Sequence, residues 1–274
     1  MEIAVAIIHG IGMQAADNPK ADLHPFAKPL VDGICRQLGA QASRVTFQSL
    51  YWADLLDQRE RAYMQRVERA GAPQRWRWLR NIITTFLGDA SGYRLVASGA
   101  SNSYQQVHAR VREGLTALRS RVAPNTPLVL ITHSLGGHVM SNYIWDQHKL
   151  NQACPSNDPF LSLETLAGLI TLGCNIPLFT FAYDTIQPIR FPGQQLSPAL
   201  RQQAQWLNWY APADPLGYPL KPLCAAYDKV VAEDIAQPVG PLLLRHTPAS
   251  HIGYWRDRQV QQRISTYLLR LLNA

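Results

Sequence analysis

Cysteine and charge are both scarce in this chain of 274 residues. There are four cysteines, and no two of them have the spacing of a zinc-binding or redox pair. We therefore expect reduced, partly buried thiols and no structural metal site. Charged residues make up only 16% of the chain and hydrophobic residues 47%. This balance excludes an intrinsically disordered chain and is typical of a globular fold with a sizeable core.

Long apolar runs are also missing. The first ten residues, MEIAVAIIHG, have no positively charged start, and their apolar run of six residues is too short for a signal peptide or a membrane span. No later segment reaches the roughly 18 apolar residues that a transmembrane helix needs. We therefore expect a soluble, cytoplasmic protein. Because the chain has no internal repeat and no low-complexity tract, we expect a single domain over residues 1–274.

Short apolar segments alternate with helical patterns along the chain. The expected strands cover residues 3–8, 45–51, 128–132, 169–172, 205–210 and 230–235. The expected helices cover residues 23–39, 104–118, 135–148 and 255–272, and a long Pro- and Gln-rich connection covers 176–204. This alternation predicts an α/β fold, with a mostly parallel central sheet and helices on both faces. In such sheets the reactive groups lie at the carboxyl ends of the strands.

The segment PLVLITHSLGGHVM, residues 127–140, carries the strongest functional signal. An apolar strand, a tight turn at Ser134 and a helix that begins at once predict a nucleophile elbow, which projects the serine hydroxyl from the edge of the sheet. The elbow needs small residues two places before and two places after the serine. Gly136 meets the second requirement, whereas Thr132 stands where a glycine is usual. The alternative is that Ser134 merely caps the following helix.

A serine hydroxyl is a weak nucleophile without an adjacent base, so an acid and a histidine are expected downstream. In NWYAPADPLGYPL, Asp214 follows the strand at 205–210 by four residues, where an acid would orient an imidazole. In HTPASHIGYW, His251 lies in a loop just before the last helix, where it would reach the serine. The alternatives are Asp184, Asp228 and Asp234 for the acid and His246 for the base.

Catalysis of this kind also needs backbone N–H donors that stabilise an oxyanion. One donor is expected from Leu135, the residue after the nucleophile. The second is expected from the glycine-containing loop IIHGIGMQ, at Ile11, with Gly12 and Met13 as alternatives. Three nearby histidines are expected to support or pack rather than to act as bases: His9, which would brace this loop, and His133 and His138, which flank the elbow.

With HGIG, THSLGG, ADPLGYPL and SHIGYW in this order, the chain resembles the α/β-hydrolase superfamily, and within it the lipase- and esterase-like serine hydrolases. The resemblance extends from residue 9 to residue 255. It implies a Ser134–His251–Asp214 triad, an acyl-enzyme mechanism, and neither metal nor cofactor. The implied activity is cleavage of a carboxylic ester in a small molecule or a lipid. Because this superfamily hosts many chemistries, a thioesterase and a catalytically silent binding protein remain alternatives.

Residues 59–80 hold most of the excess positive charge. Seven arginines and two glutamates give this segment +5 of the net charge of +7. Apolar residues recur at helical spacing from Trp76 to Leu87, so residues 53–103 are expected to form a helical cap whose apolar face lines an acyl pocket over Ser134. Two interpretations of the basic face remain open, contact with an anionic membrane or acidic substrate, and an ordinary solvated surface. No nucleic-acid partner is expected, since no recognition motif accompanies the charge.

Overall fold

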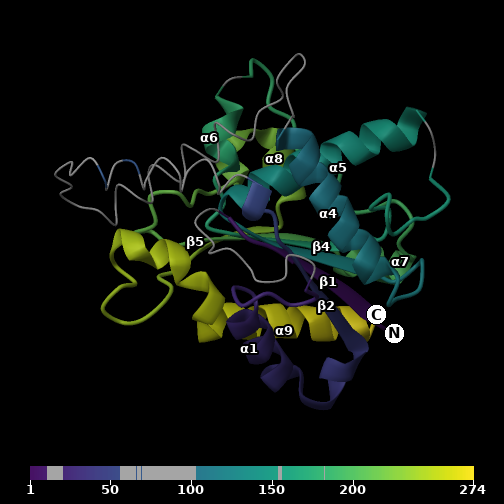
Figure 1. Cartoon of the computed structure of the whole chain (residues 1–274), viewed down its shortest axis with the longest axis horizontal. Coiled ribbons are helices and arrows are strands. Elements are labelled where there is room, and N and C mark those ends of the chain that lie inside the picture. The colour runs from purple at the N-terminus through teal and green to yellow at the C-terminus, as the bar shows by residue number, and fades with distance from the viewer. Residues whose placement is uncertain (11–20, 56–65, 67–68, 70–102, 154–155, 182) are drawn as a thin grey trace.

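A six-stranded parallel sheet forms the centre of the molecule (Figure 1). The computed structural model describes the chain apart from residues 11–20, 56–65, 67–68, 70–102, 154–155 and 182. The strands are β1 (Ile3–Ile8), β2 (Val45–Leu50), β3 (Leu128–His133), β4 (Leu166–Leu172), β5 (Gln205–Tyr210) and β6 (Glu233–Ala236). They lie in the order β2-β1-β3-β4-β5-β6, and every pairing of neighbours is parallel. The predicted α/β fold with a parallel sheet is confirmed.

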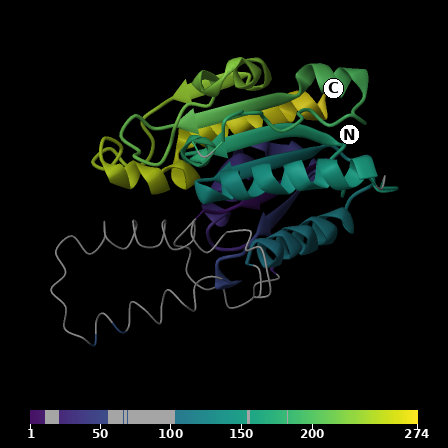
Figure 2. The ribbon, with the colours of Figure 1, turned by 90° about the horizontal axis from the view of Figure 1, so that it is seen from above.

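Helices cover both faces of this sheet. One face packs against α1 (Lys28–Leu38) and α9 (Arg258–Leu272), and the other against α4 (Ser103–Arg119) and α5 (Leu135–Ala153). Figure 2 shows α5 in front of the strands and α9 behind them. In the described part of the chain, shorter helices lie in the connections: α6 (Ile176–Thr180), α7 (Pro198–Gln203) and α8 (Ala225–Val230). None of the described helices is long and apolar enough to cross a membrane.

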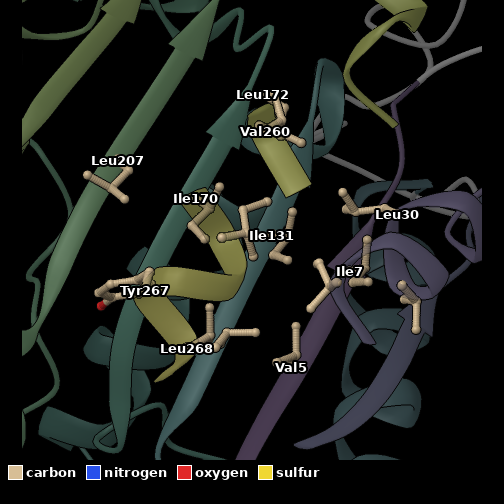
Figure 3. Close-up of a cluster of buried hydrophobic side chains, with 14 of the residues drawn as sticks. Val5, Ile7, Leu30, Ile131, Ile170, Leu172, Leu207, Val260, Tyr267 and Leu268 are labelled. Carbon is tan, nitrogen blue, oxygen red and sulfur yellow. The ribbon is translucent and has the colours of Figure 1, made fainter. Parts of the chain in front are cut away.

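The sequence of β1 is apolar throughout because both faces of this strand are buried. Ile3, Val5 and Ile7 belong to the core beneath α1 and α9, whereas Ala4 and Ile8 belong to the core on the α4 and α5 side. Successive side chains of a strand point to opposite faces, so a strand that is covered on both faces has no position for a polar residue. Figure 3 shows the first of these cores, in which side chains of the central strands meet those of α9.

Several element boundaries differ from those expected. The fourth strand begins at Leu166 rather than at residue 169, because Leu166 and Ala167 are as deeply buried as the rest of the run. The last helix begins at Arg258, since the Asp257 carboxylate accepts the N–H groups of the first turn and so fixes the start. The segment expected as a strand at 230–235 is divided between the end of α8 and the start of β6.

Candidate active site

Ser134 occupies the one-residue turn between β3 and α5. Its φ angle is 53°, a left-handed backbone conformation that residues other than glycine rarely adopt. Two hydrogen bonds hold the turn: the Ser134 N–H donates to the Leu172 carbonyl at the end of β4 (3.0 Å), and the Gly137 N–H donates to the Ser134 carbonyl (2.9 Å). A side chain held in a strained turn by its surroundings is typical of functional sites.

Glycines allow the chain to approach Ser134 closely. A Cβ atom at Gly10 would lie 2.5 Å from the Cβ of Ser134, so the loop after β1 passes directly against the serine. A Cβ atom at Gly136 would lie 2.4 Å from the carbonyl oxygen of His9. Both distances are too short for any larger residue, which explains why glycine is needed at these two positions.

The elbow accommodates Thr132 through another glycine. The side chain of Thr132 is buried at the end of β3. A Cβ atom at Gly137 would lie 3.3 Å from the Thr132 hydroxyl oxygen and 2.9 Å from the sulfur of Cys174. Because Gly137 has no side chain, there is space for the Thr132 side chain. A glycine at position 132 would not need this space.

Ser134, His251 and Asp214 form a continuous chain of hydrogen bonds. The Oγ atom of Ser134 lies 2.9 Å from Nε2 of His251, and Nδ1 of His251 lies 2.9 Å from each carboxylate oxygen of Asp214. Asp214 comes from the loop after β5, and His251 from the short 3₁₀ helix Pro248–Ile252 after β6. All three residues are buried. With Nδ1–H donating to the carboxylate, Nε2 is the acceptor for the serine hydroxyl.

Asp214 is held as a carboxylate by its neighbours. It accepts hydrogen bonds from the N–H of Leu216 (2.9 Å) and the hydroxyl of Tyr254 (2.8 Å), in addition to His251. Burial opposes the ionisation of Asp214, but these hydrogen bonds and the adjacent imidazole outweigh it and lower the pKa of the carboxyl group below its ordinary value. The negative charge that would orient and stabilise an imidazolium is therefore in place at neutral pH.

Tyr254 is a site residue to which the sequence assigned no role. Its hydroxyl donates to Oδ2 of Asp214 and accepts from the N–H of Ala211, both at 2.8 Å, so it connects the acid to the end of β5. Burial raises the pKa of the hydroxyl, which therefore stays protonated as a donor. The only signal in the sequence was the position of Tyr254 three residues after His251.

Two buried histidines support the loops of the site. The ring of His133 lies 4.8 Å from the ring of His251, and its Nε2–H donates to the His251 carbonyl (2.7 Å). Nε2 of His9 accepts from the N–H of Trp52 (3.1 Å), so Nδ1–H donates to the carbonyl of Gly10. Burial lowers the pKa of each imidazole to about 3. Both are therefore neutral supports for the base and for the loop after β1.

The alternative acids and base do not join this chain of hydrogen bonds. Asp184 and His246 are exposed. Asp228 forms an ion pair with Lys221 (3.0 Å). The carboxylate of Asp234 accepts backbone N–H groups of residues 220 and 221 and thereby fixes the loop that precedes α8. Each of the three alternative carboxylates is therefore exposed or occupied elsewhere.

Some expected residues lie outside the described part of the chain. These are Ile11 with its alternatives Gly12 and Met13, and nearly all of the expected cap at residues 53–103, including the basic segment 59–80. Leu135 is described and is the first residue of α5, directly beside the serine. Among the described residues, no group of three or more His, Cys, Asp or Glu side chains could hold a metal ion.

Comparison with known proteins adds little to this geometry. No family model matches the chain, and no curated protein matches it. Among solved structures, the chain is similar to a novel cutinase-like protein from Cryptococcus sp., with 12% identity, a TM-score of 0.40, and coverage of 99% of this chain and 95% of the other. A likeness this weak carries no argument about activity. The assignment of the site therefore depends on the geometry of its residues alone.

Proposed function

We propose that the protein is a serine hydrolase that cleaves a carboxylic ester through an acyl-enzyme on Ser134. One observation carries the proposal: a buried carboxylate, an imidazole and a serine hydroxyl are joined by hydrogen bonds of 2.9 Å at a strained turn. Groups with this geometry and these roles activate serine in unrelated folds, so the proposed activity follows from the site and not from the fold.

The arrangement supports a two-step reaction. Nε2 of His251 removes the hydroxyl proton of Ser134 as Oγ attacks the carbonyl carbon of the ester. The bond between that carbon and the alcohol oxygen then breaks, and His251 gives its proton to the departing alcohol. Water attacks the acyl-enzyme in the second step, with its proton again taken by His251. The acid is released as the proton returns to Oγ, while Asp214 stays ionised and stabilises the imidazolium in both steps.

The negative oxygen that forms in each step needs donors close to Ser134. We assign one to the N–H of Leu135, which lies at the N-terminus of α5, where the helix dipole also favours negative charge. We assign the second to the N–H of Ile11, because the preceding Gly10 brings the loop after β1 against the serine. Donors of this kind each contribute on the order of 10²- to 10³-fold to kcat.

Labelling with a fluorophosphonate, which reacts with activated serines, tests the proposal directly. The wild-type protein should be labelled and should hydrolyse at least one member of a panel of p-nitrophenyl esters and acyl-CoA thioesters of graded chain length. Ser134→Ala should lose both properties, whereas Ser141→Ala, in the helix α5 that follows the turn, should keep them. A purified Ser134→Ala protein that retains a tenth of the wild-type activity would contradict the assignment. Turnover of thioesters alone would favour a thioesterase, and no turnover or labelling would favour a binding protein.

A further inference from the structure

Three consecutive leucines are exposed in the segment that connects β6 to His251. The exposed fractions are 74% for Leu242, 87% for Leu243 and 44% for Leu244. The segment bows outward from the body in Figure 1, and the N–H groups of Leu244 and Arg245 both donate to the Pro241 carbonyl at 2.9 Å, which fixes a single turn. Isolated exposed leucines are ordinary on protein surfaces, but a contiguous exposed run marks an interaction site.

The leucine turn is fixed close to the rim of the active site. Ile252, which directly follows His251, is 61% exposed and adds to the apolar surface. The two ends of the segment meet, because a Cβ atom at Gly253 would lie 2.9 Å from the Cα of Gly240. The segment that carries the leucines therefore begins and ends at this contact, two residues after His251. A membrane or partner that bound the leucines would lie near His251.

Arginines surround the base of the same turn. Arg245, Arg256 and Arg258 line a surface hollow of about 510 Å³ next to Pro241. Within the described part of the chain, no ion pair joins any of the three to a carboxylate. One acid, Asp257, also lines the hollow, and its carboxylate already accepts backbone N–H groups at the start of α9 and at residue 240. The hollow therefore carries a net positive charge.

We propose that the leucine turn and these arginines bind the surface of an anionic lipid membrane. An apolar tip beside cations matches the layering of a bilayer, in which phosphate groups lie above an acyl interior, and this charge complementarity favours anionic lipids over a protein partner. The leucines enter the boundary with the acyl chains, and the arginines contact the phosphates. If the proposed function holds, the substrate class follows as well: the protein cleaves an ester of a lipid in that membrane surface.

Sedimentation with lipid vesicles tests the binding. Full-length protein carrying Ser134→Ala, which cannot hydrolyse the lipid, is mixed with vesicles of phosphatidylcholine alone or with added phosphatidylglycerol. We expect binding to the anionic vesicles, and a loss of about tenfold in the partition coefficient on Leu242→Ser/Leu243→Ser and on Arg256→Gln/Arg258→Gln. Leu150→Ser is the matched control, because Leu150 is 53% exposed in α5. Unchanged binding in the double-leucine variant, or an equal loss in the control, would overturn the proposal.

An activity comparison then tests the substrate class. With Ser134 intact, Leu242→Ser/Leu243→Ser should cleave a soluble short-chain p-nitrophenyl ester at the wild-type rate, but an ester embedded in anionic vesicles about tenfold more slowly. Equal rates on the embedded ester would overturn the inference about substrate while leaving the vesicle binding intact. If the wild-type protein cleaves no ester at all, the proposed function fails, and the sedimentation result still decides whether the surface binds lipid.

Discussion

Lowering the pH from 7 to 5 is expected to destabilise the folded protein through His9 and His133. Burial lowers the pKa of each imidazole from 6.5 to about 3 in the folded protein. In the unfolded chain both return to the ordinary value of about 6.5. Below that pH the unfolded chain binds protons that the folded protein does not. The stability contributed by these neutral histidines is therefore complete above pH 6.5, and it is lost as the pH falls toward 3.

The size of the effect follows from the same values. Between pH 7 and pH 5 each histidine should reduce the free energy of unfolding by about 2 kcal/mol, so the two together reduce it by about 4 kcal/mol. This is a large share of the roughly 5–15 kcal/mol that stabilises an ordinary domain. The lowered pKa of Asp214 places its own contribution at more acidic pH, outside this window.

Urea unfolding followed by tryptophan fluorescence at pH 7, 6 and 5 would measure the loss. His246→Asn, at an exposed position outside the site, is the control for the effect of a histidine substitution as such. His133→Asn should reduce the loss between pH 7 and pH 5 by about 2 kcal/mol, since one titrating group is gone. A wild-type loss smaller than about 1 kcal/mol would refute the reasoning that both imidazoles are buried and neutral.

Three further changes test the site. Asp214→Asn should lower kcat on the order of 10⁴-fold in steady-state assays with little change in KM, because the amide no longer holds His251 in the required tautomer; a loss below tenfold would contradict the role of Asp214. Tyr254→Phe removes the donor to Asp214 and the acceptor for the N–H of Ala211, so urea unfolding should show a loss of about 1–3 kcal/mol. Gly136→Ala should destabilise by a similar ~1–3 kcal/mol, because its Cβ would meet the His9 carbonyl at 2.4 Å; an unchanged urea midpoint would show that the turn has room.

The sequence predicted the central strands well because their environment is simple. β1, a short apolar run, and β5, rich in aromatic residues, have the expected boundaries. Serine, acid and base could be proposed because each follows a strand, and parallel strands end at one edge of the sheet. By contrast, α6 and α7 fall within an expected connection, because five or six residues are too few to show a helical period.

The support of the site could not be predicted because it depends on tertiary contacts. Tyr254 reaches an acid that lies 40 positions earlier in the chain. Gly173 has a φ angle of 55°, and a Cβ atom there would lie 2.8 Å from Oδ2 of Asp214. The need for glycine at this position therefore depends on a contact with Asp214 that forms only in the folded protein. The compensation between Thr132 and Gly137 likewise appears only when the end of β3 lies against α5.

The hydrogen bonds that join Ser134, His251 and Asp214 are expected to form late in folding. The bond between Ser134 and His251 joins residues 117 positions apart, and the bond between His251 and Asp214 joins residues 37 apart. Contacts between such distant parts of a chain have a large entropic cost and form after local structure. A serine activated by this network should become reactive only once β4, β5 and β6 have paired. During refolding, the rate of fluorophosphonate labelling should therefore rise after most of the secondary structure has formed.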